Sequence, residues 1–416
     1  GNFEQAHYKP QWNPDLLYSH NYVCHLGVYR KTLLDDIGGF NLGVEGSQDY
    51  DLLLRAIKHC DSEGIIHIPY VLYHWRIAEG STALAAGEKS YTDDAGLKAL
   101  QSYFANDERT SVEAGLLDNT YKVNWPIPDE PPLVSIIIPT KNGQELVKQC
   151  LDSIFTLTSY QNFEILLVDN QSDDQQALAY FNELANEQKV KLLKYDNVFN
   201  YSAINNFAVK QAQGSVIVLM NNDIEIISPN WLTEMVAQVS REDIGCVGAK
   251  LYYPTKSTAS FDKKSKAGTI QHAGVITGIG GVAGHAHKYF PAFHPGYFKR
   301  LQLVQNLSAV TAACLAVRKN VFEQVNGLNE DHLTIAFNDV DFCLKVQQQG
   351  YRNLWTPYAE MIHHESISRG AEDSPEKVAR FNSEVDYMKK TWGEQLVQDP
   401  CYNPWLTLEK EDLTYR

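Results

Sequence analysis

Two amides and a carboxylate, Asn221, Asn222 and Asp223, directly follow the apolar run of residues 215–220. A run of this length without polar alternation predicts a strand buried on both faces, as in a parallel sheet. The three polar side chains would then lie at the carboxyl edge of the sheet, where open α/β sheets bind ligands. Oxygen ligands on a short turn suit a hard divalent cation, which usually comes with a phosphate. The simpler alternative is an Asn/Asp turn that only ends the strand.

Two further apolar runs end in the same way. Residues 134–140 end at Pro139 and Thr140, and residues 163–169 end at Asp169. Segments of helical character alternate with these runs, at residues 145–155, 174–186 and 203–213. Strand and helix alternating at this spacing predict βαβ units and a parallel sheet. We therefore expect the polar strand ends to converge on one edge of that sheet.

Composition bounds the class of protein. The 416 residues are 44% hydrophobic and 21% charged, which is typical of a globular chain of two or three domains. The net charge of −15 and the lack of Lys/Arg clusters argue against nucleic acid as a partner, because such clusters bind phosphate backbones. An acidic chain can still bind a phosphorylated small ligand, since a bound metal ion inverts the local field.

Cysteine usage and hydropathy indicate the compartment. The seven cysteines are widely spread and form no Cys-x-x-Cys pair, which favours reduced thiols in the cytoplasm over disulfides or a zinc site. No stretch approaches the length of a membrane span, and no signal region is visible. We expect a cytoplasmic protein, with peripheral association at the inner face of the membrane left open. The chain begins at Gly1 rather than Met, which leaves open whether Gly1 is a native start or a fragment boundary.

A Pro-rich stretch at residues 126–132 predicts a domain boundary. We expect four parts. Residues 1–90 and 133–370 are the two larger ones. Residues 91–132 are a helical segment with a linker, and residues 371–416 are a helical extension. Residues 20–30 and 65–73 are expected to be strands. Residues 268–300 are rich in Gly, His and aromatic side chains and are expected to be a loop.

The first 80 residues repeat features of residues 306–370 in the same order. Two motifs recur. The first is Leu26-Gly-Val-Tyr-Arg30 followed by Gly39, which recurs as Leu315-Ala-Val-Arg318 followed by Gly327. The second is Gln48-Asp49-Tyr50-Asp51, which recurs as Asn338-Asp339-Val340-Asp341. The N-terminal part therefore resembles the back half of a second copy, without the front half that holds the polar strand ends. We expect it to be inactive within this chain.

Five motifs occur in order at suitable spacing: Val134-Ser-Ile-Ile-Ile-Pro-Thr-Lys-Asn142, Ile165-Leu-Leu-Val-Asp-Asn170, Asn200-Tyr-Ser-Ala-Ile-Asn-Asn206, Leu219-Met-Asn-Asn-Asp223 and Phe337-Asn-Asp-Val-Asp-Phe342. On these motifs residues 133–370 resemble family 2 glycosyltransferases of the GT-A fold, particularly bacterial enzymes that extend O-antigen or related surface polysaccharides. The resemblance implies an α/β domain with a Rossmann-like mixed sheet, preceded by a partial GT-A-like half domain.

The same resemblance implies a metal-dependent, inverting transfer of a sugar from a nucleotide-sugar donor to an oligosaccharide or lipid-linked glycan acceptor. The cofactor would be Mn²⁺ or Mg²⁺, and membership of a larger multi-domain synthase is left open. Asp169 stands where the family's carboxylate contacts the base. Pro139 and Lys141 flank the same pocket, Lys141 at a position where the family often has an aromatic. Three amides are also expected on the nucleotide-sugar, those of Asn205, Asn221 and Asn222.

Metal binding and proton transfer are implied for the remaining site residues. Asp223 would hold the cation that bridges the two phosphates, with His363 or His364 as a second ligand and His363 preferred. Asp339 falls on the position of the general base, which takes the proton of the acceptor hydroxyl as the new bond forms. Asp341, two residues on, is expected to be structural. A helix-capping role is the simpler alternative for Asp169 and for Asp339.

Two other functions compete with sugar transfer. A sugar nucleotidyltransferase would need a Gly-rich loop with Arg or Lys after the first strand, and residues 140–143 lack one. A non-catalytic glycan-binding or scaffold subunit of a synthase is favoured by the truncated N-terminal copy. The complete set of motifs in residues 133–370 favours catalysis.

Overall fold

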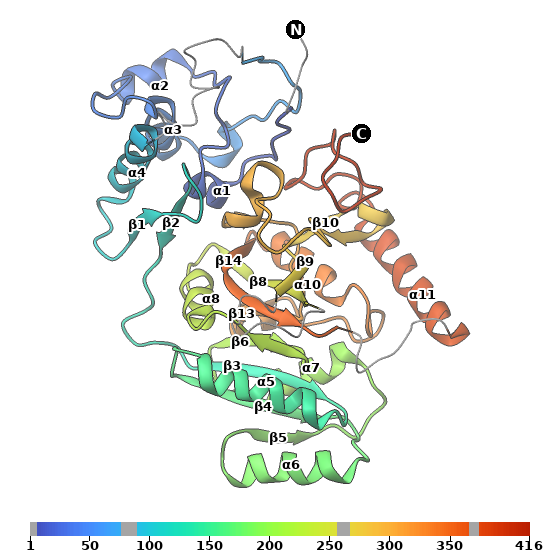
Figure 1. Ribbon diagram of the computed structural model, residues 1–416. Helices are drawn as coiled ribbons and strands as arrows, with labels where there is room; N and C mark the ends of the chain where they lie inside the picture. Colours follow the sequence, from blue (N-terminus) through green and yellow to red (C-terminus); the bar gives the residue numbers. More distant parts are fainter. Residues whose placement is uncertain (1–5, 76–89, 256–266, 366–373) are drawn as a thin grey trace.

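The computed structural model describes residues 6–75, 90–255, 267–365 and 374–416 (Figure 1). A ten-stranded sheet forms its centre, made of β3 (Val134–Thr140), β4 (Phe163–Asp169), β5 (Lys191–Lys194), β6 (Val216–Met220), β7 (Ile224–Ile226), β8 (Ile244–Pro254), β9 (Ala267–His272), β12 (Gln305–Asn306), β13 (Cys314–Arg318) and β14 (Arg352–His363). The strand order is β12-β14-β8-β13-β6-β3-β4-β5, with β7 on β14 and β9 on β8.

The front half of this sheet is parallel, as the alternating pattern predicted. β3 lies between β4 and β6, and β5 follows β4, all parallel. Successive residues of each strand enter two different cores, so that Ile137 and Leu166 lie in one and Ile136 and Ile165 in the other. The helices that cover the two faces are α5 (Gln144–Leu157), α6 (Gln175–Asn186) and α8 (Trp231–Val239) on one, and α7 (Tyr201–Val209), α9 (Lys319–Gln324) and α10 (Asn338–Gln348) on the other.

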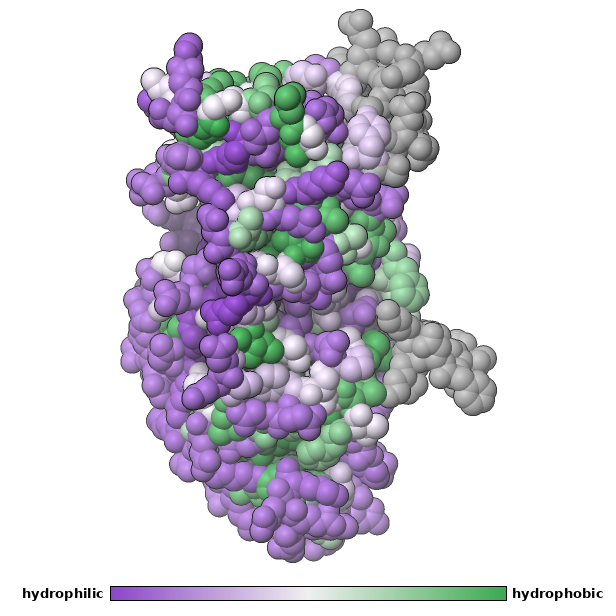
Figure 2. Space-filling view, turned by 90° about the vertical axis from the view of Figure 1, so that its left-hand side faces the viewer, coloured by the Kyte–Doolittle hydropathy of each residue, from purple (hydrophilic) through white to green (hydrophobic). Residues whose placement is uncertain are grey.

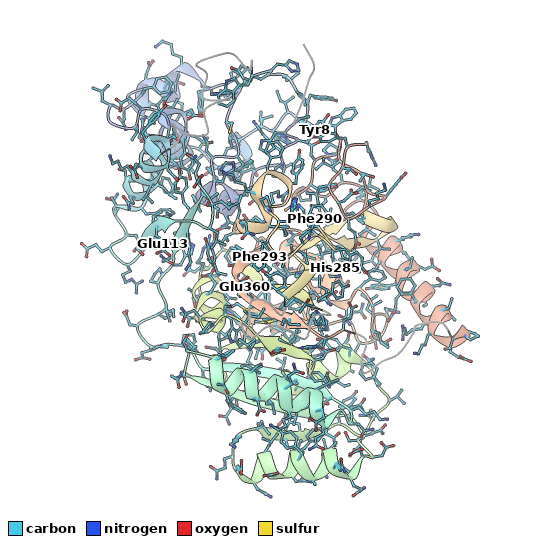
Figure 3. The ribbon with its side chains drawn as sticks, in the orientation of Figure 1. Tyr8, Glu113, His285, Phe290, Phe293 and Glu360 are labelled. Carbon is cyan, nitrogen blue, oxygen red and sulfur yellow. The ribbon has the colours of Figure 1, made fainter. Side chains whose placement is uncertain are left out.

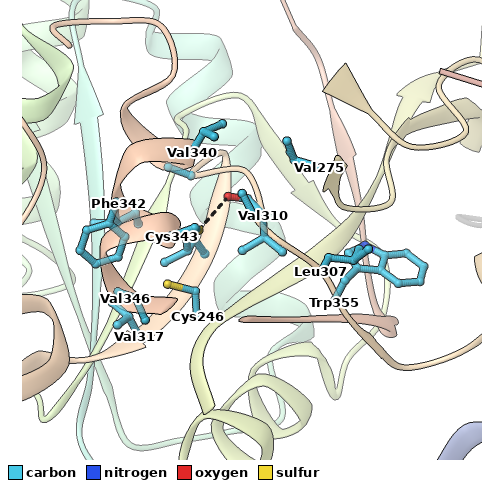
Figure 4. Packing of buried hydrophobic residues seen from close by; sticks show 14 of the residues in the cluster. Cys246, Val275, Leu307, Val310, Val317, Val340, Phe342, Cys343, Val346 and Trp355 are labelled. Carbon is cyan, nitrogen blue, oxygen red and sulfur yellow. Dashed lines mark hydrogen bonds between the residues drawn. The ribbon is translucent and has the colours of Figure 1, made fainter. Parts of the chain in front are cut away.

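The back half makes the sheet mixed. β13 runs antiparallel to both β6 and β8, and β7 runs antiparallel to β14. Behind it, Cys246 of β8, Val310, Cys343 of α10 and Trp355 of β14 belong to one completely buried cluster (Figure 4). The expected fold, an α/β domain with a Rossmann-like mixed sheet of the GT-A type, is confirmed.

The N-terminal part forms its own small core above the sheet (Figure 1). Its elements are α1 (Pro14–Ser19), α2 (Lys31–Asp36), α3 (Gln48–Ala56), the short 3-10 turns η1 (Ile57–His59) and η2 (Ser62–Gly64), α4 (Ser90–Phe104) and the hairpin β1 (Ser111–Ala114) with β2 (Tyr121–Asn124). The strands predicted at residues 20–30 and 65–73 are wrong, because both stretches lack a ladder with another strand. A strand needs the hydrogen bonds of a neighbour, and apolar character alone does not provide one.

The prediction of a loop at residues 268–300 is also wrong in part. It contains most of β9 and the hairpin β10 (Val275–Thr277) with β11 (Ala283–His285), whose turn is the 3-10 segment η4 (Ile279–Gly281). A second 3-10 segment, η5 (Tyr297–Gln302), follows. Gly274 serves close packing: with φ +94°, a Cβ there would fall 1.8 Å from a methyl of Leu307.

The C-terminal residues are helical and then irregular, as expected, with α11 (Pro375–Trp392) followed by turns. Within the described ranges, no helix combines the length and the apolar character that crossing a membrane requires.

Candidate functional site

Three strand ends meet at one edge of the sheet. Thr140 of β3 lies opposite Asp169 of β4, and the backbone N–H of Asn170 donates to the carbonyl of Thr140 at 2.8 Å. From the third strand end, the side-chain amide of Asn222 donates to Thr140 Oγ1 at 2.9 Å. The structure thus brings Asp169 and Asn222 to the two sides of Thr140, as the convergence of parallel strands predicts.

The loops after β3 and β4 are tied together beside this edge. Asn142, in the left-handed region with φ +55°, donates from its side chain to Asp173 at 2.7 Å and from its backbone to Ser172 Oγ at 2.7 Å. The backbone N–H of Ser172 in turn donates to Asp169 Oδ1 at 3.1 Å. This last bond is a contact within the turn after β4, and it uses one oxygen of the carboxylate. It does not cap a helix, because α6 begins at Gln175 and is capped by Asp174. Pro139 is partly buried and Lys141 exposed at the start of the first loop.

Asp223 and His363 lie against each other. β7 and β14 pair antiparallel with Ile224 opposite His363, which places His363 Nε2 3.1 Å from Asp223 Oδ1. Both residues are buried, with exposed fractions of 6% and 8%. The amide nitrogen of Asn221 lies 3.2 Å from the same Nε2.

The hydrogen bonds around His363 assign its tautomer. Gln271 donates from Nε2 to Glu365 at 2.9 Å, so its Oε1 faces His363 Nδ1 at 2.7 Å and Nδ1 carries the proton. In the neutral ring Nε2 then bears a lone pair, with the amide nitrogen of Asn221 and a carboxylate oxygen of Asp223 both close to it. The ring nitrogen and the carboxylate oxygen at this distance attract each other only through a cation or a proton between them. This donor set fits a divalent metal, with Gln271 orienting the histidine from behind.

His364 has a different environment from its neighbour. Its Nε2 lies 3.1 Å from Glu225 Oε2 and 3.1 Å from Gln149 Nε2 of α5. Of the two histidines left open by the sequence, the structure therefore places His363 beside Asp223. No group of three or more His, Cys, Asp or Glu side chains in the described ranges is arranged to hold a metal ion. A cation at Asp223 and His363 would take its other ligands from phosphate oxygens and water.

Asp339 stands at the start of α10, next to the same edge. Its Oδ2 accepts from the backbone N–H of Ala312 at 3.0 Å, and its Oδ1 from that of Val340 at 2.9 Å. The carbonyl of Ala313 accepts from the backbone N–H of Asn221 at 3.0 Å. Ala312, which binds Asp339, and Ala313, which binds Asn221, are thus neighbours in the chain.

The pKa of Asp339 lies above its usual value. Burial raises it, and the hydrogen bonds from Ala312, Thr311 and Val340 offset only part of that effect. The residue as a whole is half-buried. A raised pKa in a carboxylate beside a ligand-binding edge suits a general base.

Asn205 and Asp341 turn inward instead. Asn205 is completely buried in α7, where its amide nitrogen donates to Tyr201 O at 2.8 Å and its amide oxygen has no hydrogen-bond partner among the described residues. Asp341 accepts from Trp392 Nε1 at 2.9 Å and pairs with Lys345 at 3.1 Å, the structural role expected of it.

Two buried histidines lie beside His363, from the Gly- and His-rich stretch. His272 Nδ1 is 2.9 Å from His285 Nδ1, and Figure 3 shows His285 in the middle of the molecule, between the N-terminal part and the parallel half of the sheet. Burial, with His285 and His363 close by, lowers the pKa of His272 well below its usual value. Burial also lowers the pKa of His285, to about 4, so neither ring is expected to add charge to the site at neutral pH.

The residues that sequence reasoning missed are Asn142, Ser172, Gln271 and Thr311. Asn142 stands inside a motif that was recognised, so its position could have been found. Gln271 meets His363 across 92 positions of the chain, and no spacing in the sequence indicates that contact.

A separate hollow of about 540 Å³ lies at the opposite edge of the sheet, near Pro128, Gly214 and Lys319. The cations that line it are already engaged: Arg318 donates to the carbonyls at the end of α8 and Lys319 to that of Ala212. Among the described residues that line it, Glu323 is the one carboxylate and none is a histidine, so it lacks a pair of groups for acid-base chemistry or metal binding.

Comparison with known proteins agrees with the geometry. Residues 135–325 match the family model described as Glycosyl transferase family 2. An uncharacterised protein of Sinorhizobium fredii, y4gI, is 48% identical over 98% of this chain, which covers 44% of y4gI. The O-antigen biosynthesis protein RfbC of Myxococcus xanthus is 36% identical over 100% of this chain, which covers 31% of RfbC. The chain thus spans less than half the length of either relative.

Among solved structures, a mannosyltransferase of Pyrobaculum calidifontis in complex with GDP-Man and Mn²⁺ aligns with a TM-score of 0.41 and 16% identity, over 65% of this chain and 75% of its own. A TM-score at this level carries no argument. The family is therefore assigned from the family match and the two relatives. The chain belongs, through residues 135–325, to glycosyl transferase family 2.

Proposed function

We propose that residues 133–370 transfer a sugar from a nucleotide-sugar to a hydroxyl of a bacterial surface glycan, with inversion at the anomeric carbon and with a divalent metal. The observation that carries the proposal is the pairing of Asp223 with the lone pair of His363, 3.1 Å apart, at the edge that also holds Asp169. Family membership supports the reaction class, and the name of RfbC supports the kind of acceptor.

The donor would lie along the edge formed by β3, β4 and β6. Asp169 would use Oδ2 for a hydrogen bond from the nucleotide, since the bond from Ser172 goes to Oδ1. Pro139 and the stem of Lys141 would flank the base, because a lysine stem covers apolar surface while its charge stays in water. Asn221 and Asn222 would approach the diphosphate or the sugar.

Asp223 and His363 would hold the metal, Mn²⁺ or Mg²⁺. When bound there, such a cation would offset the negative charge that develops on the departing nucleoside diphosphate. The chain itself supplies the geometry of the two ligands: β7 and β14 fix their backbones, and Gln271 fixes the ring of His363.

Asp339 would act as the general base. It takes the proton of the acceptor hydroxyl while the hydroxyl oxygen bonds to the anomeric carbon and the bond from that carbon to the diphosphate breaks. Proton removal of this kind contributes about 10²–10⁴-fold to rate. One displacement at the anomeric carbon inverts its configuration.

The acceptor and the setting are proposed from the relatives. An oligosaccharide or lipid-linked glycan fits a protein similar to one named for O-antigen biosynthesis. Such an acceptor would place the enzyme at the inner face of the membrane. Because both relatives are more than twice as long as the part they share with this chain, a multi-domain synthase is the proposed context.

Two measurements test this function. Melting temperatures are recorded with UDP-, dTDP- and GDP-sugars, each with and without Mn²⁺, because a ligand that binds only the native state raises the melting temperature. The expected result is that one donor class raises it, and that Mn²⁺ increases the effect. The linkage formed with that donor is then read by NMR, and retention of configuration would contradict the displacement.

The matched variants are Asp339→Asn and Asp223→Asn. Asp339→Asn should bind the donor normally and lose transfer, whereas Asp223→Asn should lose the Mn²⁺ effect on donor binding. A protein that binds glycan and shows no donor binding under any condition would instead be a scaffold subunit.

A further inference from the structure

The N-terminal part repeats the local geometry of the family domain. α2 and α9 each have six residues, preceded by Arg30 (φ −63°, ψ 135°) and Arg318 (φ −65°, ψ 138°) in almost the same conformation. Both helices lead into a left-handed glycine, Gly39 with φ +67° and Gly327 with φ +65°. The sequence repeat is therefore also a repeat of structure.

The helices that carry the two acidic motifs agree as well. In α3, Asp51 pairs with Arg55 one turn later at 2.7 Å, as Asp341 pairs with Lys345 in α10 at 3.1 Å. Asp49 accepts the backbone N–H of the next residue at 2.9 Å, as Asp339 does at 2.9 Å. The N-terminal part thus has the two helices of the back half in their proper conformation.

The two copies differ in the strands that accompany these helices. In the family domain the residues before Arg318 form β13, which lies between β6 and β8, and residues 314–317 are completely buried. The corresponding residues before Arg30 form no strand ladder within the described ranges. Leu26 and Val28 there are 66% and 88% exposed.

Residues 65–75 correspond to β14 and are exposed in the same way. Apolar side chains there face solvent, with exposed fractions of 83% for Ile66, 58% for Ile68 and 66% for Leu72. The ring of His25 lies 5.3 Å from that of Tyr73 and 5.5 Å from that of Trp75, so the two stretches, residues 25–30 and 65–75, meet at His25. We call these two stretches together the apolar edge. Hydrophobic side chains are visible at this end of the molecule in Figure 2.

We propose that the apolar edge docks a βαβ half-domain built like residues 133–226, carried by the same polypeptide outside these 416 residues. The later copy shows what covers such an edge, because there β6 of the front half pairs antiparallel with β13 through five residues. The front half at residues 133–226 is already occupied by its own back half, so it is not available to the N-terminal copy. The relatives that match the whole chain provide room for a further half, since the chain covers 44% and 31% of them.

Exposed side chains and backbone groups together suit an added strand. Apolar side chains are exposed along residues 66–75, alternating up to Tyr70 and continuously beyond it. The backbone groups of residues 26–29 offer donors and acceptors to that strand, whereas the carbonyl of Arg30 already accepts from Leu34. Exposed edges of this kind pair readily with another strand unless they are covered. A neighbouring strand with an apolar face would cover the exposed side chains and would also pair with the backbone groups.

Hydrogen exchange on two forms of the protein tests the proposal. The 416-residue chain and the protein as its gene encodes it are compared by mass spectrometry. In the longer protein, amides of residues 26–30 and 66–72 should exchange about 100-fold more slowly or better, because ladder amides open only with the element that holds them. Amides of β3 and β6 should exchange alike in both forms. Equal exchange at the apolar edge, or a gene that encodes nothing beyond these residues, would overturn the proposal.

Surface variants supply the control. Val28→Lys and Ile68→Lys should leave the melting temperature of the 416-residue chain unchanged, because both side chains are exposed, and should remove the added protection in the longer protein. Val397→Lys, at a position 76% exposed in the C-terminal segment, should do neither. Should the 416-residue chain form a dimer that Val28→Lys dissociates, a second copy covers the edge and the proposed occupant is wrong.

Discussion

At the scale of single residues, the site depends on an unusual contact between two acceptor atoms. His363 Nε2 lies beside Asp223 Oδ1 because its other nitrogen is held by Gln271, and Gln271 is held by Glu365. A histidine whose proton is fixed on the far side of the ring is a typical metal ligand. His364, one residue on, contacts Glu225 instead and provides a natural control.

Replacing each histidine separately tests the metal assignment. His363→Ala should weaken the Mn²⁺ dependence of donor binding by about tenfold or more, since one of two protein ligands is lost. His364→Ala should leave it unchanged, although it removes contacts with Glu225 and Gln149. Isothermal titration of the donor at graded Mn²⁺ concentrations measures both. Equal losses in the two variants would show that neither histidine binds the metal directly.

The raised pKa of Asp339 leads to a prediction about pH. A base acts only when it is deprotonated, and the deprotonated fraction falls as the pH drops through the pKa. Because burial raises this pKa, kcat/KM should begin to fall at a higher pH than an ordinary Asp, of pKa about 3.9, would give. Asp339→Asn should lower kcat about 10²–10⁴-fold and remove this acidic limb. A limb that persists in Asp339→Asn would assign it to another group.

Which site residues could be predicted follows from their position in the chain. Asp169 and Asp223 follow apolar runs directly, and strand ends of a parallel sheet share one edge, so pattern alone brings them together. Asp339 required the family motif, because an Asp at the start of a helix is common for other reasons. Gln271 could not be predicted, since its role comes from a tertiary contact with His363.

At the scale of elements, the same limit separates the correct strands from the wrong ones. Residues 134–140 and 163–169 were predicted as strands and form them, because each has a neighbour in the sheet. Residues 20–30 have similar apolar character and form none, since the described chain gives them no partner. Residues 268–300 show the opposite error: glycines suggested a loop, yet β9 finds a partner in β8.

α11 is an element whose role no motif indicated. Glu384, 1% exposed, accepts from Thr334 Oγ1 at 3.0 Å and from the backbone N–H of Ile335 at 2.8 Å. At the last residue of the helix, Trp392 donates to Asp341 at 2.9 Å. The helix thus holds the loop that leads into α10, on which Asp339 stands.

Removing that support should affect catalysis more than binding. Glu384→Ala should lower kcat about tenfold while KM for the donor stays unchanged, because misplacing a catalytic group costs rate. Glu384→Gln keeps an acceptor oxygen and should recover most of the rate. Glu376→Gln, exposed in the first turn of α11, is the matched control and should have no effect. An equal rise in KM for the donor would mean that the loop belongs to the donor site instead.

At the scale of the whole molecule, a buried polar network joins the N-terminal part to the family domain. Asp15 of α1 pairs with Arg241 at 2.6 Å and with Arg352 at 3.4 Å, and accepts from Asn306 at 2.7 Å. Burial alone would raise the pKa of Asp15, but the charges of Arg241 and Arg352 outweigh it and hold the pKa below its usual value. The network explains how a part without its own complete sheet remains fixed on the domain.

Asp15→Asn should therefore destabilise the folded chain by about 3–5 kcal/mol, because Arg241 loses its close, buried counter-charge and keeps only the longer pair with the more exposed Asp243, at 3.6 Å. The matched control is Asp35→Asn, which breaks an exposed pair with Lys31 and should cost at most about 1 kcal/mol. A carboxyl whose folded pKa is lowered stabilises the protein above its unfolded pKa and loses this effect as the pH falls through the folded value. In urea titrations, the difference between Asp15→Asn and the unchanged chain should thus be full at pH 7 and shrink below about pH 4. A difference that stays constant down to pH 2 would mean that Asp15 acts through packing and hydrogen bonds rather than through its charge.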